Sequence, residues 1–347
     1  MTAGTFRIED VSTLAEVPPD AWRRIAPGGN LYQTYEWMRA AEAIAGKGVT
    51  YHCAVTPGGD LCGCLPVYGY RPGGNPGYDP MRLYATAEDG RRWYPHALYG
   101  ARSGYLQRPL ADPGLAPEPR RRLLRALIAR ADAPGRRAAS ASFPFVAADT
   151  ATDLSACLPG GWSVRPAGPA AALDVPEDGF DGYLRSFPAR RRTMVKREVQ
   201  ALAEQGVTVV EGGLTEYLPL IARLGTGTQQ RHGSTIREDR LRAALELQAR
   251  WLAGRDWVLA AYRGPVCLGV VLSYRCGDTL FPRLVGLDHD EPATRRARVY
   301  FNLLFYELVR RSARAGIRRA WLGPGALDAK LRRGCSAFPL VCAVREP

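Results

Sequence analysis

The spacing of hydrophobic residues predicts helices and strands in alternation along the chain. Apolar residues recur at intervals of three and four in the stretches expected to be helices, which are 32–45, 119–131, 188–205, 214–230, 238–253 and 300–315. Shorter apolar runs predict a hairpin over 51–70 and strands at 138–146, 207–211, 257–262, 266–276, 279–287 and 317–322. Three strands in meander, then a helix and a further strand, indicate an α/β (α+β) fold in which helices flank a mixed, largely antiparallel sheet.

One helix-and-hairpin pattern occurs twice. Residues 51–70 align without a gap with residues 257–276, and each segment follows a helical stretch. Four identical pairs carry the alignment, namely Ala54 with Ala260, Gly58 with Gly264, Gly63 with Gly269, and Tyr68 with Tyr274. We therefore expect duplicated domains. The segment 159–178 is rich in proline and glycine and marks the junction, which gives two domains, 1–165 and 166–347.

This order of elements resembles two GNAT acyltransferase domains in tandem, as in the Fem-type aminoacyltransferases and the related peptidoglycan-biosynthesis-like family. The likeness rests on segment 183–207, on Gly-Leu-Asp at 286–288 and on segment 298–335. It implies an enzyme that takes an amino acid from aminoacyl-tRNA and forms an amide on the amine of a small-molecule or peptide acceptor. That acceptor would be a cell-wall precursor or a natural-product intermediate. The resemblance further implies that the first domain receives the acceptor and the second receives the donor and carries out catalysis.

The charge of the chain points to an anionic partner. Lys and Arg number 47 against 34 Asp and Glu, a formal net charge of +13, which fits nucleic acid or an acidic surface. A solvated basic surface is the alternative. The first twenty residues lack an apolar core and no window approaches ~18 uninterrupted apolar residues, so we expect a cytoplasmic protein without a transmembrane segment. The eight scattered cysteines are expected to be buried, reduced thiols.

Arginines crowd two predicted helix starts, where the helix dipole is positive. One group opens the helix 188–205 and the other precedes the helix that begins near Val299. A cation at such a place costs a few tenths to ~1 kcal/mol, and a bound phosphate would turn that cost into a gain. The predicted tRNA- or phosphate-binding residues are Arg190, Arg191, Arg192, Lys196, Arg197, Arg295, Arg296, Arg298, Arg332 and Arg333. A solvated basic face is again the alternative.

Lys330 and Asp288 are the candidate catalytic residues. Lysine is rare in this chain, so a lysine among arginines indicates that a compact ammonium is required. The family resemblance implies that Lys330 stabilises the oxyanion formed on the ester carbonyl or holds the tRNA 3′ end; a surface lysine is the alternative. Asp288 ends a central strand, a common position for ligand contacts, and is a candidate weak general base.

Four residues are candidates for a substrate pocket. Asn302 and Tyr306 lie four residues apart, off the apolar stripe of helix 300–315, and either line a channel or cap the edge of the sheet. Tyr300 and Tyr274 complete the predicted pocket. No His or Cys spacing typical of a metal site is present.

Two other functions remain open. A CoA-dependent N-acyltransferase would have the same fold, but segment 288–298 lacks the glycines that let backbone N–H groups approach a pyrophosphate. A non-catalytic RNA-binding module would need only the basic clusters. We expect aminoacyl-tRNA as a co-substrate and no further cofactor, and the oligomeric state stays open.

Overall fold

The computed structural model describes residues 5–26, 28–46, 48–85 and 91–347. The chain divides into two compact units, Met1–Pro169 with Pro339–Pro347 (unit 1) and Ala170–Phe338 (unit 2). The junction lies a few residues beyond the expected one. Residues 339–347, which the sequence analysis assigned to the second domain, belong to unit 1. Strand pairing over such a long separation leaves no local signal in the sequence.

Unit 1 is built around a sheet in the order β1-β2-β3-β4-β6-β13, with β5 paired to β3. All neighbours are antiparallel except β4 and β6. Its elements are β1 (Arg7–Val11), α1 (Pro19–Ile25), α2 (Tyr35–Ala45), β2 (Val49–Val55), β3 (Leu61–Tyr70), α3 (Pro80–Leu83), β4 (His96–Tyr99), β5 (Leu110–Ala111), α4 (Pro117–Ala131), β6 (Ser140–Ala147), α5 (Ala151–Ser155), the start of β7 (Trp162–Asp174) and most of β13 (Ser336–Arg345).

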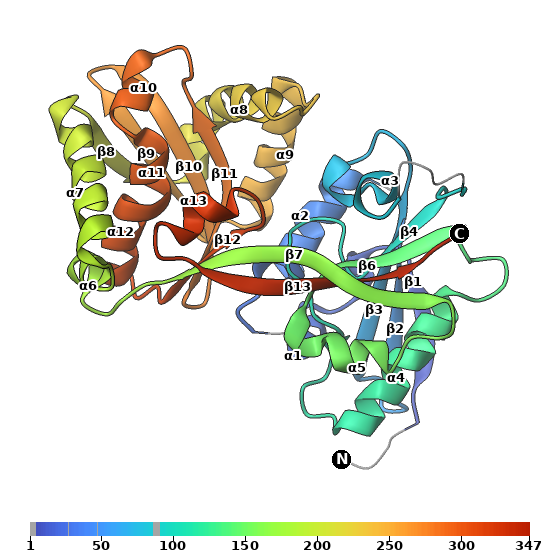
Figure 1. The fold of residues 1–347 in the computed structure, drawn as a ribbon. Coiled ribbons are helices and arrows are strands. Elements are labelled where there is room, and N and C mark those ends of the chain that lie inside the picture. Colours follow the sequence, from blue (N-terminus) through green and yellow to red (C-terminus); the bar gives the residue numbers. More distant parts are fainter. Residues whose placement is uncertain (1–4, 27, 47, 86–90) are drawn as a thin grey trace. The chain divides into compact units, whose positions relative to one another are not determined.

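Unit 2 has the sheet order β7-β12-β11-β10-β9-β8, antiparallel except where β11 meets β12. Helices α8 and α9 lie on one face, and α7, α11 and α12 lie on the other (Figure 1). Its elements are α6 (Gly179–Arg185), α7 (Ala189–Glu204), β8 (Thr208–Gly212), α8 (Leu214–Arg231), α9 (Glu238–Trp251), β9 (Asp256–Arg263), β10 (Val266–Cys276), β11 (Thr279–Leu287), α10 (Pro292–Arg296), α11 (Val299–Phe301), a π-helical segment (Asn302–Glu307), α12 (Leu308–Arg314), β12 (Arg319–Gly323) and α13 (Leu327–Leu331). The predicted fold class is confirmed.

Two glycines that match in the internal alignment, Gly63 on β3 and Gly269 on β10, have the same packing role. A Cβ at Gly63 would lie 2.5 Å from Leu123 Cδ2 on α4, and one at Gly269 would lie 2.9 Å from Val299 Cγ1 on α11. Neither distance leaves room for a side chain. In both units glycine therefore lets a helix approach the hairpin closely.

The repeated tyrosines are also used alike. Tyr68 Oη contacts Met38 Sδ on α2 at 3.9 Å, and Tyr274 Oη donates to Gln248 Oε1 on α9 at 2.7 Å. Each helix is the one that precedes the hairpin. Both tyrosines are buried, so the repeat is a repeat of packing as well as of sequence.

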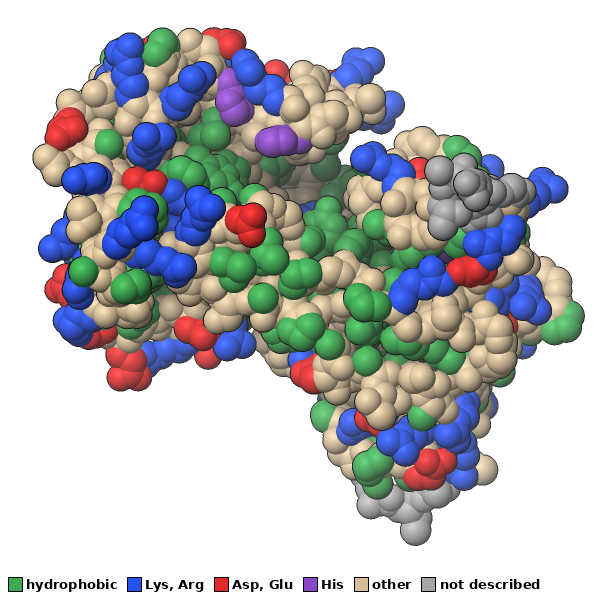
Figure 2. Space-filling model, in the orientation of Figure 1, with side chains coloured by type: hydrophobic (Ala, Val, Ile, Leu, Met, Phe, Trp, Pro, Cys, Tyr) green, Lys and Arg blue, Asp and Glu red, His purple; other side chains and the backbone are tan. Residues whose placement is uncertain are grey.

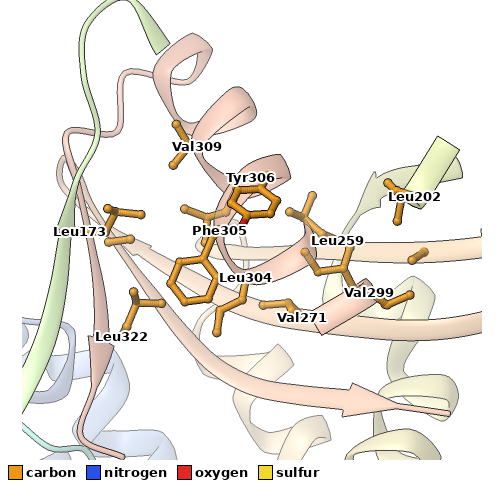
Figure 3. Packing of buried hydrophobic residues seen from close by; sticks show 14 of the residues in the cluster. Leu173, Leu202, Leu259, Val271, Val299, Leu304, Phe305, Tyr306, Val309 and Leu322 are labelled. Atoms are coloured by element: carbon orange, nitrogen blue, oxygen red, sulfur yellow. The ribbon is translucent and has the colours of Figure 1, made fainter. Parts of the chain in front are cut away.

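The core of unit 2 follows the stripe predicted for residues 300–315. Leu304, Phe305, Leu308 and Val309 are each at most 4% exposed, and the cluster includes Leu259 from the sheet (Figure 3). Burying side chains of this size contributes about 1.5–3 kcal/mol each. In the described part of the chain, no helix combines the length and the apolar character that crossing a bilayer requires.

Candidate functional site

The first cationic cluster lies at the start of α7. Pro188 is the residue before the helix, its side chain provides no cap, and the first turn contains no acidic residue. Arg190 and Arg191 are exposed there, and Arg192 is half-buried. The helix therefore begins with positive charge added to the positive end of its own dipole, which favours an anion at this position.

The second cluster, predicted from a segment about a hundred residues away, meets the first. Arg296 ends α10, and Arg298 links α10 to α11 in the left-handed backbone region, with φ 53° and ψ 38°. A surface hollow of about 950 Å³, which we call the cation hollow, is lined by Arg190, Arg191, Thr193, Met194, Arg197, Glu198, Ala201, Arg296, Arg298 and Arg332. Figure 2 shows Lys and Arg side chains gathered over this part of unit 2.

Most of these cations have no acidic partner. Among the described residues, no carboxylate forms an ion pair with Arg190, Arg191, Arg192, Lys196, Arg197, Arg295, Arg296, Arg298 or Arg332. Uncompensated charge of one sign around a hollow raises the local concentration of anions. The arrangement is therefore suited to bind several phosphate groups.

A smaller pocket of about 220 Å³ adjoins the cation hollow through Arg298, which lines both. It is formed by Arg231, Leu287, His289, Glu291, Pro292, Thr294, Arg295, Arg298, Val299, Tyr300 and Phe301. Of the predicted substrate-pocket residues, Tyr300 lies here. Burial lowers the pKa of His289, so its imidazole is neutral at pH 7.

Arg333, a predicted phosphate ligand, is buried in this structure and paired with a carboxylate. It is 5% exposed, and its Nη2 and Nε donate to the Glu198 carboxylate at 2.5 and 3.2 Å. Its guanidinium also lies 3.1 Å above the centre of the Phe301 ring. The Arg333 guanidinium is therefore buried behind Glu198, which lines the cation hollow and neutralises the charge of Arg333.

Asn302 and Tyr306 are fully buried, so they line no pocket in this structure. Tyr306 Oη donates to Glu198, and Asn302 Nδ2 donates to the carbonyl of Glu198 at 2.9 Å. Both residues lie in the π-helical segment, and they join it to α7. Tyr274 is buried against α9, away from these residues in the fold, and forms no pocket with Tyr300.

Lys330 is buried as well, and all three N–H donors of its ammonium are engaged in hydrogen bonds. Nζ donates to the carbonyls of Leu322, Gly323 and Pro324 at 2.9, 2.9 and 3.1 Å. Burial lowers its pKa to about 8. Because an ammonium has three donors, none is left here for a developing oxyanion. The geometry thus gives Lys330 the task of fixing the loop between β12 and α13.

Asp288 and its neighbours fill the loop where the GNAT resemblance would expect a pyrophosphate. Asp288 Oδ1 accepts from the backbone N–H groups of Asp290 and Glu291, both at 3.2 Å. Glu291 Oε1 accepts from the N–H of Ala293 at 3.2 Å. The loop's own carboxylates therefore occupy the amides that a pyrophosphate would need, and the Asp288 oxygen that makes these bonds is not a free base.

Sequence reasoning missed Glu198, which holds Arg333 and Tyr306 together. The available signal was a single acidic residue in the first three turns of a helix crowded with cations. All eight cysteines are free and buried, and the described residues contain no group of three His, Cys, Asp or Glu side chains that could hold a metal ion.

Comparisons with known proteins agree with this architecture. The model of the FemAB-like family, described as peptidoglycan biosynthesis/recognition, matches residues 13–344. A search of curated proteins finds no match. FemX is similar in structure, with a TM-score of 0.61, 14% identity and 96% of each chain covered.

Two further solved structures share the fold. One is the C-terminal domain of a putative lysylphosphatidylglycerol synthetase from Agrobacterium fabrum, with a TM-score of 0.53, 10% identity, and 90% of this chain and 86% of that chain covered. The other is a tandem GNAT protein from the clavulanic acid biosynthesis pathway, with a TM-score of 0.52, 12% identity, and 97% and 98% covered. The predicted tandem GNAT fold of the Fem type is confirmed. Family and fold together support an acyltransferase.

Proposed function

Because the chain belongs to the FemAB-like peptidoglycan biosynthesis/recognition family, we propose that it is an aminoacyltransferase that uses aminoacyl-tRNA as its donor. It joins the amino acid to the amine of a small-molecule or peptide acceptor. The observation that carries the proposal is the cation hollow of unit 2, whose arginines have no acidic partner among the described residues.

An RNA backbone suits this hollow better than a small ligand does. Six arginines line about 950 Å³, which is large enough for several nucleotides. RNA offers a row of phosphates at regular spacing, and each contact with Arg or Lys releases counterions. Arg298 borders both the hollow and the smaller pocket, so an RNA strand bound in the hollow would have its aminoacyl end near His289 and Tyr300.

The reaction requires only two substrates in contact. The acceptor nitrogen attacks the ester carbonyl of the donor, an amide bond forms, and the ester bond to the ribose oxygen breaks. The ribose oxygen leaves with a proton that originates from the amine. The contribution of the protein is then to hold the two substrates and to stabilise charge on the carbonyl oxygen, and Arg298 is the exposed cation nearest to the shared edge of the two cavities.

The loop at Asp288 favours aminoacyl-tRNA over acyl-CoA. Its backbone amides are engaged by Asp288 and Glu291, so a pyrophosphate would have to displace carboxylates from its own binding position. Such a displacement opposes binding because like charges would approach each other. We therefore expect acyl-CoA to be a poor donor.

The test is an assay of transfer from a mixture of labelled aminoacyl-tRNAs to amines of a cell extract. We expect a labelled amide product, and we expect CoA and acetyl-CoA neither to compete nor to raise the melting temperature. The variant Arg190→Gln/Arg191→Gln/Arg197→Gln should reduce the slope of log affinity for tRNA against log salt by about two to three. Transfer from acetyl-CoA without transfer from aminoacyl-tRNA would overturn the proposal. Binding of tRNA without any transfer would indicate an RNA-binding module instead.

A further inference from the structure

Unit 1 contains a loop, residues 100–108, whose conformation is fixed by buried polar side chains. Asn30 Nδ2 donates to the carbonyl of Leu106 at 3.3 Å, and Gln33 Nε2 donates to the carbonyl of Arg108 at 2.6 Å. Gln33 Oε1 also accepts from the N–H of Arg108 at 2.9 Å. Asn30 and Gln33 are 3% and 1% exposed. Buried amides that satisfy a loop backbone make that loop rigid.

The same loop is tied to β6. Gln107 donates its N–H to the carbonyl of Phe145 at 3.0 Å and accepts from the N–H of Ala147, also at 3.0 Å. Phe145 itself has a φ of 53°, which a bulky residue rarely adopts. A non-glycine residue in this region costs about 1–3 kcal/mol and is typical of functional sites.

Aromatic residues hold the tip of the loop. Gly104 has a φ of +97°, and a Cβ there would lie 2.2 Å from Cγ of Tyr32. Tyr78 Oη donates to the carbonyl of Gly104, and the Tyr78 ring stacks on Tyr105. These contacts fix the backbone at the tip of the loop. A side chain that projects from the loop is therefore held at a defined position.

What it presents is Arg102, a half-buried arginine that forms no hydrogen bond or ion pair with any described residue. Its guanidinium carbon lies 5.6 Å from the centre of the Tyr68 ring. That contact is a cation–π contact and not a hydrogen bond, so the five N–H donors of the guanidinium have no acceptor among the described residues. Burial lowers the pKa of Arg102 from its ordinary value, but an arginine keeps its charge at neutral pH.

Glu42, which lies beside Tyr51 and near Tyr68, forms no ion pair with Arg102. Glu42 on α2 reaches Tyr51 Oη at 3.1 Å and the N–H of Leu14 at 3.0 Å, and it pairs with Arg39 at 3.7 Å. Both carboxylate oxygens of Glu42 are thus already engaged. No nitrogen of Arg102 is among the buried side-chain atoms that lack a partner, so water reaches these donors and an anion can take the place of that water.

We propose that Arg102 is the centre of an anion-binding subsite in unit 1, which takes a carboxylate or phosphate group of the acceptor. A planar guanidinium binds either group through two parallel N–H bonds, and the rigid loop sets their direction. The assignment to the acceptor rests on the proposed function, and it adds that the acceptor carries an anionic group. The binding site itself does not depend on tRNA.

The test measures anion binding with tRNA absent, in the full chain carrying Arg190→Gln/Arg191→Gln/Arg197→Gln so that the cation hollow contributes little. The probes are pyrophosphate and N-acetylglycine, followed by calorimetry and by protection of Arg102 from phenylglyoxal, read by mass spectrometry. We expect at least one probe to protect Arg102, and Arg102→Gln to weaken its binding about tenfold or more. Arg137→Gln, at an exposed arginine of the same unit without a described ion pair, should change binding less than twofold.

The outcomes separate the possible sources of the anion. Protection by pyrophosphate alone supports a phosphorylated acceptor, protection by N-acetylglycine alone supports a carboxylate, and protection by both supports a subsite for either group. The proposal is overturned if neither probe protects Arg102, or if Arg102→Gln binds as tightly as its parent. A large drop in melting temperature in Arg102→Gln would also overturn it, because the residue would then be a structural one. Failure of aminoacyl transfer alone would leave this subsite intact.

Discussion

Helices α4 and α7 both carry several cationic side chains, but they differ in whether acidic residues pair with those side chains. Each has several arginines along its exposed side, yet three of the five in α4 form ion pairs: Arg121 with Asp153 at 2.7 Å, Arg125 with Glu118 at 3.1 Å and Arg130 with Asp10 at 2.8 Å. The cations of α7 have no acidic partner among the described residues.

The difference lies in where acidic residues fall in the sequence. Helix α4 has Glu118 in its first turn and acidic residues on β1 and α5 beside it, whereas the first turn of α7 has no acid. Counting arginines would rank the two helices alike. What distinguishes a binding surface from an ordinary one is whether the protein already uses the donors of its cations.

The buried pair beneath α7 should show the largest effect. Glu198→Ala leaves the buried charge of Arg333 without its carboxylate, so we expect a loss of about 3–5 kcal/mol in the free energy of unfolding, measured with urea. Glu204→Gln, at an exposed glutamate of the same helix, should change it by less than about 0.5 kcal/mol. If Glu198→Ala were no less stable than Glu204→Gln, Arg333 would have to be counted among the free cations.

Lys330, which lies in the short helix α13, tests the same distinction at a second buried cation. Lys330→Met leaves the carbonyls of Leu322, Gly323 and Pro324 without their donor, and we expect a loss of about 2–4 kcal/mol in the free energy of unfolding. Lys330→Arg should not restore stability, because a planar guanidinium does not fit the place of a compact ammonium. A variant that folds with full stability but has lost turnover would return Lys330 to the catalytic residues.

Matched triple variants compare the two helices directly. Arg190→Gln/Arg191→Gln/Arg197→Gln on α7 should lower the affinity for tRNA about a hundredfold at roughly 0.1 M salt, with no loss of stability. Arg121→Gln/Arg125→Gln/Arg130→Gln on α4 should leave tRNA affinity within about threefold and lower the free energy of unfolding by about 1 kcal/mol. Filter binding measures the affinity for tRNA, and thermal unfolding measures the change in stability. Equal losses of tRNA affinity would mean that pairing does not decide which cations bind.

The smallest effect concerns pH at Asp10, which accepts from Arg130 of α4. Burial acts to raise the pKa of Asp10, but hydrogen bonds with Arg130 and His52 outweigh it, and the net pKa is lowered. A carboxyl with a lowered pKa in the folded state stabilises the protein above its unfolded pKa of about 3.9 and loses that contribution as the pH falls further. The stability difference between the wild type and Asp10→Asn should therefore shrink below about pH 4. A difference that stays constant from pH 7 to pH 3 would contradict the pairing.

The sequence was sufficient for the duplicated hairpin and most of the long helices, because their hydrophobic periods are strong and local. It did not predict β1 or β13, and it treated the segment that forms β7 as a junction. The stripe through Leu304 and Val309 and the duplicated hairpin were both readable, and so were the two arginine clusters that meet in the cation hollow. Spacing also excluded a glycine loop for CoA.

The burial and the interaction partners of individual polar residues could not be predicted from the sequence. Arg333 and Lys330 looked like exposed cations because their partners, Glu198 and the carbonyls at the end of β12, meet them only in the folded chain. Arg102 was not predicted as a functional residue. The loop has no hydrophobic periodicity, and nothing in the sequence shows that Asn30 and Gln33 fix its backbone. In all these cases the deciding interaction joins residues that the sequence separates.

The return of residues 339–347 to unit 1 has a consequence for synthesis on the ribosome. Unit 2 is one uninterrupted segment, so it can complete its sheet as soon as it has emerged. In unit 1 the first strands are made earliest, and β6 can pair with β4, but β6 gains its second neighbour only when Leu340 to Arg345 have been made. Domains usually fold in the order of their synthesis, N-terminal first. Unit 1 is therefore begun first and completed last, and until β13 has been made one edge of β6 stays unpaired and open to pairing with another chain.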